Sequence, residues 1–324
     1  MPPTTSLTSP NGGEVWAAGS SRAITASITG TITGWQLDYS TNGGSTWTMI
    51  YGISTTNTSV NYLWTVPNSV SSTCKVRITV NYTGGSVTDA SNANFSITDN
   101  TLPVVTALDV SSASIIQGGS VTISYSATDN VGLSKVELYR APGGSTPPTT
   151  GWVLVKSNSA SGTSTSSSFT DSPPLGTYWY GVTVYDTSNN KGEAPSSWLK
   201  KVIVSAAPTV TLTSPNGGES WAAGSSRTIT ASCSGTITGW QLDYSTNGGS
   251  TWTMINGIST TSLPSSYNWT VPSAPSSTCR VKLTLLYSGG SVSDTSNANF
   301  TIQSPPALRL ARVHLMGQCC QPSR

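Results

Sequence analysis

An internal repeat dominates this chain, because residues 7–97 return almost unchanged as residues 212–302. Leu-Thr-Ser-Pro-Asn-Gly-Gly-Glu opens both copies, at Leu7 and at Leu212, and every equivalent pair is 205 positions apart. No residue has been gained or lost along the repeat, and about three quarters of the aligned residues are identical. The repeated stretch is therefore predicted to be a self-contained folding unit. Tandem arrays of this kind most often hold, space or adhere, and they seldom catalyse.

The repeat divides the 324-residue chain into three domains and a tail. Each domain is about 100 residues long, which is enough to bury a separate core. The joints at 99–103 and 205–208 are short and end in proline, which favours an extended, semi-rigid rod. We predict a first repeat copy at 1–98, a different β-sandwich at 99–207, a second repeat copy at 208–303 and an atypical tail at 304–324.

Strand-like runs of alternating apolar and polar residues fill all three predicted domains. Each run is short and is bounded by Gly, Asn, Ser or Pro, and no stretch has a helical period beyond one turn. The Ser/Thr/Gly-rich residues 162–168 are predicted to form a loop. The pattern predicts an all-β chain of antiparallel sandwiches, each with a core lined by tryptophan. The inward positions of two runs are Cys74, Val76, Ile78 and Val80, and Tyr178, Tyr180, Val182 and Val184.

The composition excludes several classes of partner. Charged residues make up only 9% of the chain, and the Lys and Arg behind its net charge of +2 are scattered. No basic stripe indicates nucleic acid. No apolar run approaches the roughly 20 residues of a membrane-spanning helix, and no secretory signal is predicted in the chain as given. The 11 Trp and 12 Tyr residues argue against disorder, so we expect ordered β-structure with a Ser/Thr-coated surface.

Residue sets for catalysis are missing from the sequence. A Ser-His-Asp or Cys-His arrangement needs a histidine beside the nucleophile, and the single histidine, His314, lies in the atypical tail. Zinc sites need clustered Cys and His, which the chain lacks. The chain is therefore predicted not to be an enzyme, with no catalytic residue, cofactor-binding residue, cofactor or metal ligand. Glycosidases use a pair of carboxylates, and four carboxylates do recur here by duplication. Their recurrence can reflect the duplicated fold as readily as a catalytic site. They are Asp38, Asp89, Asp243 and Asp294.

One group of oxygen donors is a candidate calcium site. Asp129, Asn130 and Asp186 lie in loop-like segments of the middle domain. Two acids and an amide fall short of the about six to eight oxygen ligands that Ca²⁺ takes. Asp and Asn also cap their own backbone in turns. We favour turn chemistry for these residues.

A recurring turn motif has the same structural explanation. Residues 40–47 read Ser-Thr-Asn-Gly-Gly-Ser-Thr-Trp and recur at 245–252. They resemble the Asp-box, with Asn in place of Asp, in which a polar side chain ties a hairpin turn and the Trp packs beneath it. In a propeller the motif would recur once in each blade, and two occurrences cannot build one.

Tryptophan faces stack on sugars, which makes the tryptophans candidate ligand contacts. Trp35 and Trp240 share the parity of apolar neighbours and are expected in the core. Trp152, Trp179 and Trp198 are less constrained, and Trp179 has the parity opposite to Tyr178 and Tyr180. We favour core or half-buried packing for them over sugar binding.

The cysteines do not form a disulfide framework. Cys233 and Cys279 both have inward parity, and they are either bridged or two reduced thiols that pack as small apolar residues. We favour the thiols. Cys319 and Cys320 belong to the tail, whose Arg-rich and Thr-free composition fits a shifted reading frame, a truncated gene or vector-derived residues better than a basic binding tail. The five cysteines are Cys74, Cys233, Cys279, Cys319 and Cys320.

The repeat also resembles a known family. Ser-Pro-Asn-Gly-Gly-Glu-x-Trp from Ser9, Trp-Thr-Val-Pro from Trp64 and Ser-Asn-Ala-Asn-Phe-Ser-Ile from Ser91 resemble the Kre9/Knh1-like, Ser-Thr-rich cell-wall module of surface and secreted proteins. The middle segment, with Ala-Thr-Asp-Asn-Val-Gly at 127–132, more loosely resembles bacterial immunoglobulin-like modules. The resemblances imply three tandem immunoglobulin-like or fibronectin-III-like antiparallel sandwiches, and they carry no catalytic residue.

Two functions remain as hypotheses. The first is a non-catalytic extracellular or cell-surface protein for structure or adhesion, which acts as spacer, stalk or assembly unit. The alternative is a set of accessory polysaccharide-binding modules from a secreted hydrolase. The partners are not identified by the sequence, and cell-surface glycans and copies of the chain itself are the two classes considered.

Overall fold

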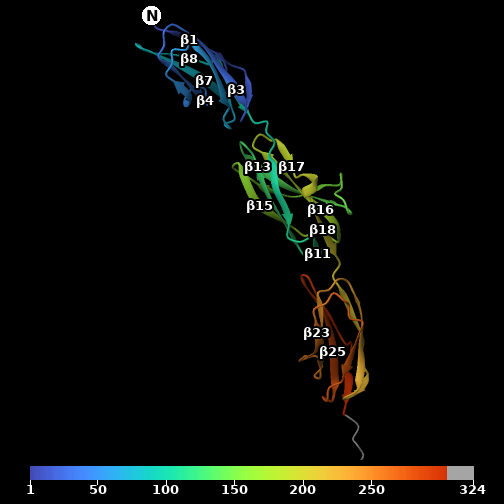
Figure 1. Ribbon diagram of the computed structural model, residues 1–324. Helices are drawn as coiled ribbons and strands as arrows, with labels where there is room; N and C mark the ends of the chain where they lie inside the picture. The colour runs from blue at the N-terminus through green and yellow to red at the C-terminus, as the bar shows by residue number, and fades with distance from the viewer. Residues whose placement is uncertain (305–324) are drawn as a thin grey trace, which may run out of the picture. The chain divides into compact units, whose positions relative to one another are not determined.

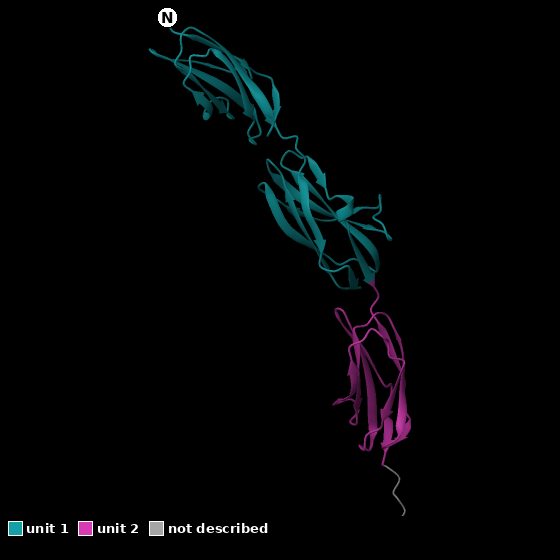
Figure 2. Ribbon diagram, in the orientation of Figure 1, with its two compact units in different colours: residues 1–204 teal, residues 205–324 magenta. Residues whose placement is uncertain are grey.

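The computed structural model describes residues 1–304 and is all-β (Figure 1). The described part contains strands β1–β27 and one short 3-10 helix, η1 (Ser196–Trp198). The chain divides into two compact units, residues 1–204 and 205–324 (Figure 2). Unit 1 contains two β-sandwiches with separate cores, and unit 2 contains one. The predictions for the tail, His314, Cys319 and Cys320 fall outside the described residues.

The first sandwich packs a three-stranded sheet against a six-stranded sheet. The order is β1-β3-β6 in the small sheet and β2-β9-β7-β4-β5 in the large one, with β8 also paired to β7. The short β2 runs parallel to β9, and the other pairs are antiparallel. This is the arrangement of an immunoglobulin-like or fibronectin-III-like sandwich. The strands are β1 (Thr4–Ser9), β2 (Val15–Ala17), β3 (Ser21–Thr29), β4 (Gly34–Ser40), β5 (Thr48–Ile53), β6 (Ser59–Thr65), β7 (Ser71–Tyr82), β8 (Gly85–Ala90) and β9 (Phe95–Thr98).

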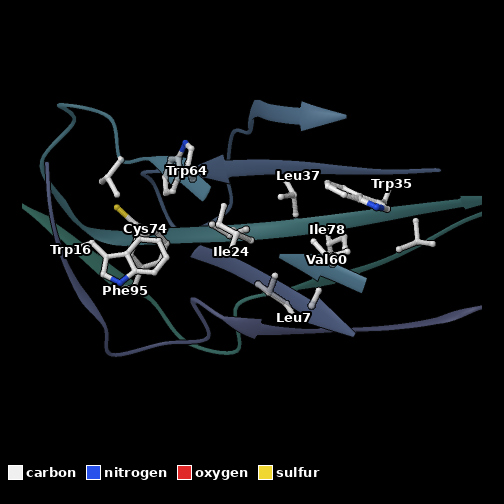
Figure 3. Close-up of a cluster of buried hydrophobic side chains, with 14 of the residues drawn as sticks. Leu7, Trp16, Ile24, Trp35, Leu37, Val60, Trp64, Cys74, Ile78 and Phe95 are labelled. Atoms are coloured by element: carbon white, nitrogen blue, oxygen red, sulfur yellow. The ribbon is translucent and has the colours of Figure 1, made fainter. Parts of the chain in front are cut away.

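The core of the first sandwich lies between its two sheets, as the side chains in Figure 3 show. Within it, the ring centroid of Trp16 lies 5.1 Å from that of Phe95 and 6.1 Å from that of Trp64. Burial of each such side chain stabilises the fold by about 1.5–3 kcal/mol. The predicted alternation along β7 is confirmed, because its inward side chains are all 0% exposed: Cys74, Val76, Ile78 and Val80.

The outward face of β4 is more buried than simple alternation suggests. Asp38 and Ser40 are only 3% and 2% exposed. Arg77 covers this face, with Nη2 at 3.0 Å from Asp38 Oδ2 and its guanidinium 4.5 Å from the centroid of Trp47. A buried carboxylate is tolerated here because it has a cationic partner.

Unit 2 repeats the first sandwich strand for strand. The order is β19-β21-β24 in the small sheet and β20-β27-β25-β22-β23 in the large one, with β26 paired to β25. The aromatic contacts are also repeated, with the ring centroid of Trp221 5.2 Å from that of Phe300 and 6.2 Å from that of Trp269. The strands are β19 (Thr209–Ser214), β20 (Ser220–Ala222), β21 (Ser226–Ser234), β22 (Gly239–Ser245), β23 (Thr253–Ile258), β24 (Ser266–Thr270), β25 (Ser276–Tyr287), β26 (Gly290–Thr295) and β27 (Phe300–Gln303).

The middle sandwich belongs to unit 1 and has the same kind of architecture. Its small sheet has the order β10-β12-β15 and its large sheet β11-β18-β16-β13-β14, with β17 paired to β16. The strands are β10 (Val104–Val110), β11 (Ser114–Ile116), β12 (Val121–Thr128), β13 (Leu133–Pro142), β14 (Val153–Ser159), β15 (Ser164–Asp171), β16 (Gly176–Asp186), β17 (Lys191–Glu193) and β18 (Lys200–Ser205).

The core of the middle sandwich is lined by tyrosine and phenylalanine. Tyr125, Phe169 and Tyr180 are its buried aromatic residues. The prediction of a tryptophan-lined core is therefore wrong for this sandwich, because Trp179 has the outward parity on β16. Tyr180 is 0% exposed, and its hydroxyl donates to Asp171 Oδ2 at 2.8 Å, so the buried phenol keeps a hydrogen-bond partner.

The predicted loop at 162–168 is mostly strand. Residues 164–168 begin β15 and pair with residues 128 to 124 of β12. β15 is an edge strand of the small sheet, and Phe169 is its only buried residue. Main-chain hydrogen bonds to β12 can hold such a polar strand, so the hydrophobic pattern did not reveal it.

The strands of successive sandwiches are separated by residues 99–103 and 206–208. These short segments coincide with the joints expected from the sequence. The domain limits themselves stay a prediction, since the compact units divide the chain only between Val204 and Ser205.

Candidate functional site

The duplicated carboxylates have structural partners. Asp89 Oδ2 accepts a hydrogen bond from the Leu7 backbone N–H at 2.7 Å, and Asp294 Oδ2 accepts the same bond from Leu212 at 2.7 Å. Asp38 is paired with Arg77 as described above. Its counterpart Asp243 accepts hydrogen bonds from Gln241 Nε2 at 2.9 and 3.1 Å. These contacts explain the duplication of the four residues through the fold.

The Asp-box-like turns are hairpin devices of the expected kind. Asn42 Oδ1 accepts hydrogen bonds from the Thr46 backbone N–H and from Ser40 Oγ, both at 2.9 Å. The chain passes Gly44 with φ at +95°, where a Cβ would lie 3.2 Å from the ring of Trp47. The second copy repeats these hydrogen bonds around Asn247 at 2.8 and 2.9 Å. The motif therefore stabilises the turn by hydrogen bonds and packs the Trp ring against it, and it brings no reactive groups together.

The tryptophans divide between core and surface. Trp35 is buried and Trp240 half-buried against its core. Trp152 and Trp179 are half-buried, and their indole N–H groups donate to the carbonyls of residues 148 and 144 at 3.0 and 3.2 Å. Trp198 in η1 is 37% exposed. The expectation of core or half-buried packing is confirmed for Trp152 and Trp179, while Trp198 is more exposed.

Two open grooves lie on the middle sandwich. One has a volume of about 510 Å³ and is lined by residues that include Tyr125, Trp198 and Lys200. The other has a volume of about 530 Å³ and is lined by residues that include Trp152 and Tyr185. Both combine an aromatic ring with hydroxyl and charged groups, which is the mixture that polar ligands use.

A hydrogen-bonded network lies beside the second groove. Glu137 Oε1 accepts from Lys135 Nζ at 2.6 Å, and Oε2 accepts from the Tyr139 hydroxyl at 2.8 Å. The hydrogen bond to Glu137, together with burial, raises the pKa of Tyr139 to about 12. The phenol that lines the groove is therefore a neutral donor and acceptor, unsuited to act as a base near neutral pH.

Three buried carboxylates meet at one end of the middle sandwich. Asp99 follows β9, Asp129 follows β12 and Asp186 ends β16. They are 5%, 9% and 1% exposed. One oxygen from each lies within 4.8 Å of the others. This is the one group of three or more possible metal-ligating side chains in residues 1–304.

Each of these carboxylates uses one oxygen in a local turn. Asp129 Oδ1 accepts from the backbone N–H groups of residues 131 and 132 at 2.8 and 2.7 Å. Asp186 Oδ1 accepts from those of residues 188 and 190 at 2.8 and 2.7 Å. Asp99 Oδ1 accepts from that of residue 101 at 3.1 Å. The predicted turn chemistry is confirmed for Asp129 and Asp186, and it occupies only part of each carboxylate.

The remaining oxygens are unevenly satisfied. Asp186 Oδ2 accepts from Asn190 Nδ2 at 2.6 Å. Asp99 Oδ2 and Asp129 Oδ2 are buried without a hydrogen-bond partner, as is Asn130 Oδ1. Burial raises the pKa of the Asp99 carboxyl above its ordinary value, and the negative charges of Asp129 and Asp186 raise it further.

Sequence reasoning found Asp129, Asn130 and Asp186 but not Asp99. Asp99 belongs to the joint before the middle sandwich, and only folding brings it to the loops at 129 and 186. Asn190 Nδ2 donates to the Asp99 carbonyl at 3.0 Å and fixes the joint there. The one available signal was an acidic residue at the start of a Pro-containing joint.

The cysteines with described positions are all reduced. Cys74, Cys233 and Cys279 are free thiols, so the bridge between Cys233 and Cys279 is not formed and the preferred alternative is confirmed. Cys233 lies near the end of β21 in the small sheet, whereas Cys279 lies near the start of β25 in the large one. Burial raises the pKa of all three thiols.

No helix within residues 1–304 has the length and apolar character that a membrane-spanning helix requires.

Comparison with known proteins identifies no family. No family model matches the chain, and no curated protein does. Solved structures do match, among them three consecutive domains of titin, which are 12% identical over 94% of this chain and 100% of that chain, with a TM-score of 0.40. The FN domains of chicken CNTN1 are 12% identical over 93% and 98%, with a TM-score of 0.30. Fibronectin(III)-like modules of Clostridium thermocellum CbhA are 15% identical over 63% and 95%, with a TM-score of 0.27. At these identities and TM-scores, no functional inference follows from the likeness.

Proposed function

We propose that this chain is a non-catalytic structural or adhesion protein of the cell surface or extracellular space. Its sandwiches act as spacer or assembly units. The observation that carries this proposal is the repetition of one complete sandwich, with the same strand order and the same aromatic contacts, before and after a different sandwich in the chain. Repetition of a closed fold multiplies a surface or a length, whereas it adds nothing to a single catalytic centre.

Two further observations support the proposal. The duplicated carboxylates Asp38, Asp89, Asp243 and Asp294 all make structural contacts. The chain is only 9% charged, which leaves a surface of hydroxyl groups that suits hydrogen bonding to glycans or to other copies of the chain. The resemblance of the repeat to Kre9/Knh1-like cell-wall modules leads to the same location.

The test uses the complete chain in two assays. Sedimentation over a wide range of protein concentration measures self-association, and a pull-down on insoluble cell-wall glycans measures adhesion. We expect one of the two to be saturable and to persist at high salt, because few charges are available to be screened. Conversion of a peptide, ester or glycoside substrate by the purified chain would overturn the proposal.

A second candidate is an accessory polysaccharide-binding role, favoured by the groove of about 530 Å³ that Trp152 lines on the middle sandwich. The ring of Trp152 packs above Gly181, where a Cβ would lie 3.7 Å from the ring. A rigid, half-exposed indole beside hydroxyl and charged groups suits a sugar ring.

The two candidates are separated by Trp152→Ala, with Trp198→Ala in the other groove as the matched control. Polysaccharide binding through the groove predicts a loss of glycan retention of about tenfold in Trp152→Ala and none in the control. Equal retention of both variants would exclude this groove as the binding surface and leave the structural role.

A further inference from the structure

The acidic cluster of Asp99, Asp129 and Asp186 is an electrostatic anomaly. Its oxygens lie within 4.8 Å of one another, and none of its residues is more than 9% exposed. The ion pairs of the described chain are made by other residues and leave the cluster without a cation. Like charges at this spacing repel, and each also loses its hydration on burial. A bound cation would remove both costs.

The unpartnered oxygens give this cluster the character of a ligand site. Asp99 and Asp129 are more than nine-tenths buried, and Oδ2 of each has no hydrogen-bond partner. Buried polar atoms are nearly always satisfied, so an orphaned carboxylate oxygen is rare. Here two such oxygens occur in one cluster, while Oδ1 of each residue is held by backbone N–H groups. The turns therefore fix the carboxylates and leave Oδ2 free to coordinate.

The donor set selects the kind of ion. The three side chains offer carboxylate oxygens, which are hard donors that suit Ca²⁺ or Mg²⁺ rather than a transition metal. Ca²⁺ tolerates irregular geometry and longer bonds, whereas Mg²⁺ requires a near-ideal octahedron and keeps most of its water. Carboxylates held by three separate turns at up to 4.8 Å fit the larger and more adaptable ion.

We propose that Asp99, Asp129 and Asp186 bind one Ca²⁺ ion, and that the ion fastens the joint before the middle sandwich to that sandwich. The remaining ligands that Ca²⁺ requires are supplied by water. This site is independent of whether the chain adheres, spaces or binds glycans.

The joint at 99–103 contacts the middle sandwich at two points. Asn190 Nδ2 donates to the Asp99 carbonyl at 3.0 Å. A Cβ on Gly192 would lie 1.8 Å from the carbonyl oxygen of Pro103, so the joint runs directly over β17. Without the ion, Asp99 brings its charge against two other carboxylates, and their repulsion opposes this docking. With the ion, the same charge holds the joint in place.

The experiment uses the full chain freed of metal by chelation. Calorimetric titration with CaCl₂ is expected to give one site per chain with a Kd of about 1 mM or below, within the range of extracellular calcium modules. Hydrogen exchange is expected to slow in residues 99–103 and 186–190 on addition of Ca²⁺. Substitution Asp99→Asn is expected to raise the Kd about tenfold or more. Mg²⁺ is expected to bind at least about tenfold more weakly.

The matched control is Asp109→Asn, which removes an exposed carboxylate from the same sandwich and should leave the Kd unchanged. Asp99→Asn should fold at least as well as the natural chain in calcium-free buffer, because it relieves repulsion, and its thermal midpoint there checks this. The proposal is overturned if the titration with CaCl₂ gives no binding heat and hydrogen exchange is unchanged. It is also overturned if Asp99→Asn binds Ca²⁺ as tightly as the natural chain, or if the natural chain binds Mg²⁺ as tightly as Ca²⁺.

Discussion

The carboxylate of Asp89 accepts a hydrogen bond from the backbone N–H of Leu7, with 2.7 Å between Oδ2 and N. Leu7 lies on β1 of the small sheet and Asp89 on β8, which pairs with the large sheet, so this bond joins the two layers of the first sandwich. Asp294 and Leu212 repeat the bond at the same distance in unit 2. A side chain that satisfies a backbone donor of the facing sheet supports the sandwich itself, so its duplication reflects the fold.

Asp89→Ala is expected to destabilise the first sandwich by about 1–3 kcal/mol, because the N–H of the buried Leu7 loses its partner. Hydrogen exchange of the full chain measures this as faster exchange in β1 and β3. Asp294→Ala is the internal control, since it should produce the same loss in β19 and β21 and leave the first sandwich unaffected. Unchanged exchange near Leu7 in Asp89→Ala would contradict the assignment.

Gly192→Ala is expected to displace the joint from the middle sandwich. Its Cβ would lie 1.8 Å from the Pro103 carbonyl oxygen and 2.8 Å from the carbonyl carbon, and backbone atoms cannot yield as a flexible side chain can. Overpacking of this kind costs about 1–3 kcal/mol or more. Limited proteolysis should cut the joint faster in this variant. Gly144→Ala has open space at its Cβ and should behave like the natural chain; resistance of Gly192→Ala to the protease would show that the joint lies elsewhere.

The alternation of the strands could be predicted from the sequence, because burial of every second side chain is a local consequence of strand geometry. Val76 and Tyr180 were placed correctly on this basis, and both are 0% exposed. Ser164 was placed wrongly, since a polar edge strand is held by main-chain bonds that leave no hydrophobic pattern. The aromatic content of a core also depends on parity, which put Trp179 outward and Tyr180 inward on β16.

The acidic cluster shows a different limit. Asp129 and Asp186 could be recognised as turn residues because their hydrogen bonds are local. Asp99 joins them only through the docking of the joint, which depends on contacts such as that between Asn190 and the Asp99 carbonyl. A donor set assembled across about 90 positions has no local signature, so the sequence revealed two of its three acids as a pair too small for calcium.

Protonation of Glu137 is expected to make the middle sandwich less stable in acid. The hydrogen bond from Lys135, with that from Tyr139, lowers the pKa of Glu137 below its ordinary value. A carboxylate with a lowered folded-state pKa stabilises the fold above its unfolded pKa of about 4.3, and this contribution disappears as the pH falls through the folded value.

The measurement compares the thermal midpoints of the natural chain and Glu137→Gln at neutral pH and near pH 3. We expect Glu137→Gln to be less stable by about 1 kcal/mol at neutral pH, since Lys135 is 42% exposed and its charge is screened. The difference should vanish in acid. Glu193→Gln, in a pair whose side chains are 53% and 62% exposed, should change little at either pH. A pH-independent difference would assign the effect of Glu137 to packing.

Alkylation should distinguish the three described thiols. Cys74 and Cys279 are 0% exposed and Cys233 is half-buried, and burial raises the pKa of each. Thiolate is the reactive form, so both effects slow the reaction. In native protein, iodoacetamide should modify Cys74 and Cys279 at least about 100-fold more slowly than Cys233, because their sandwiches must open first. Urea should abolish the difference. Peptide mapping measures each site, and a disulfide between Cys233 and Cys279 in the unreduced digest would contradict the separation of these thiols between the two sheets.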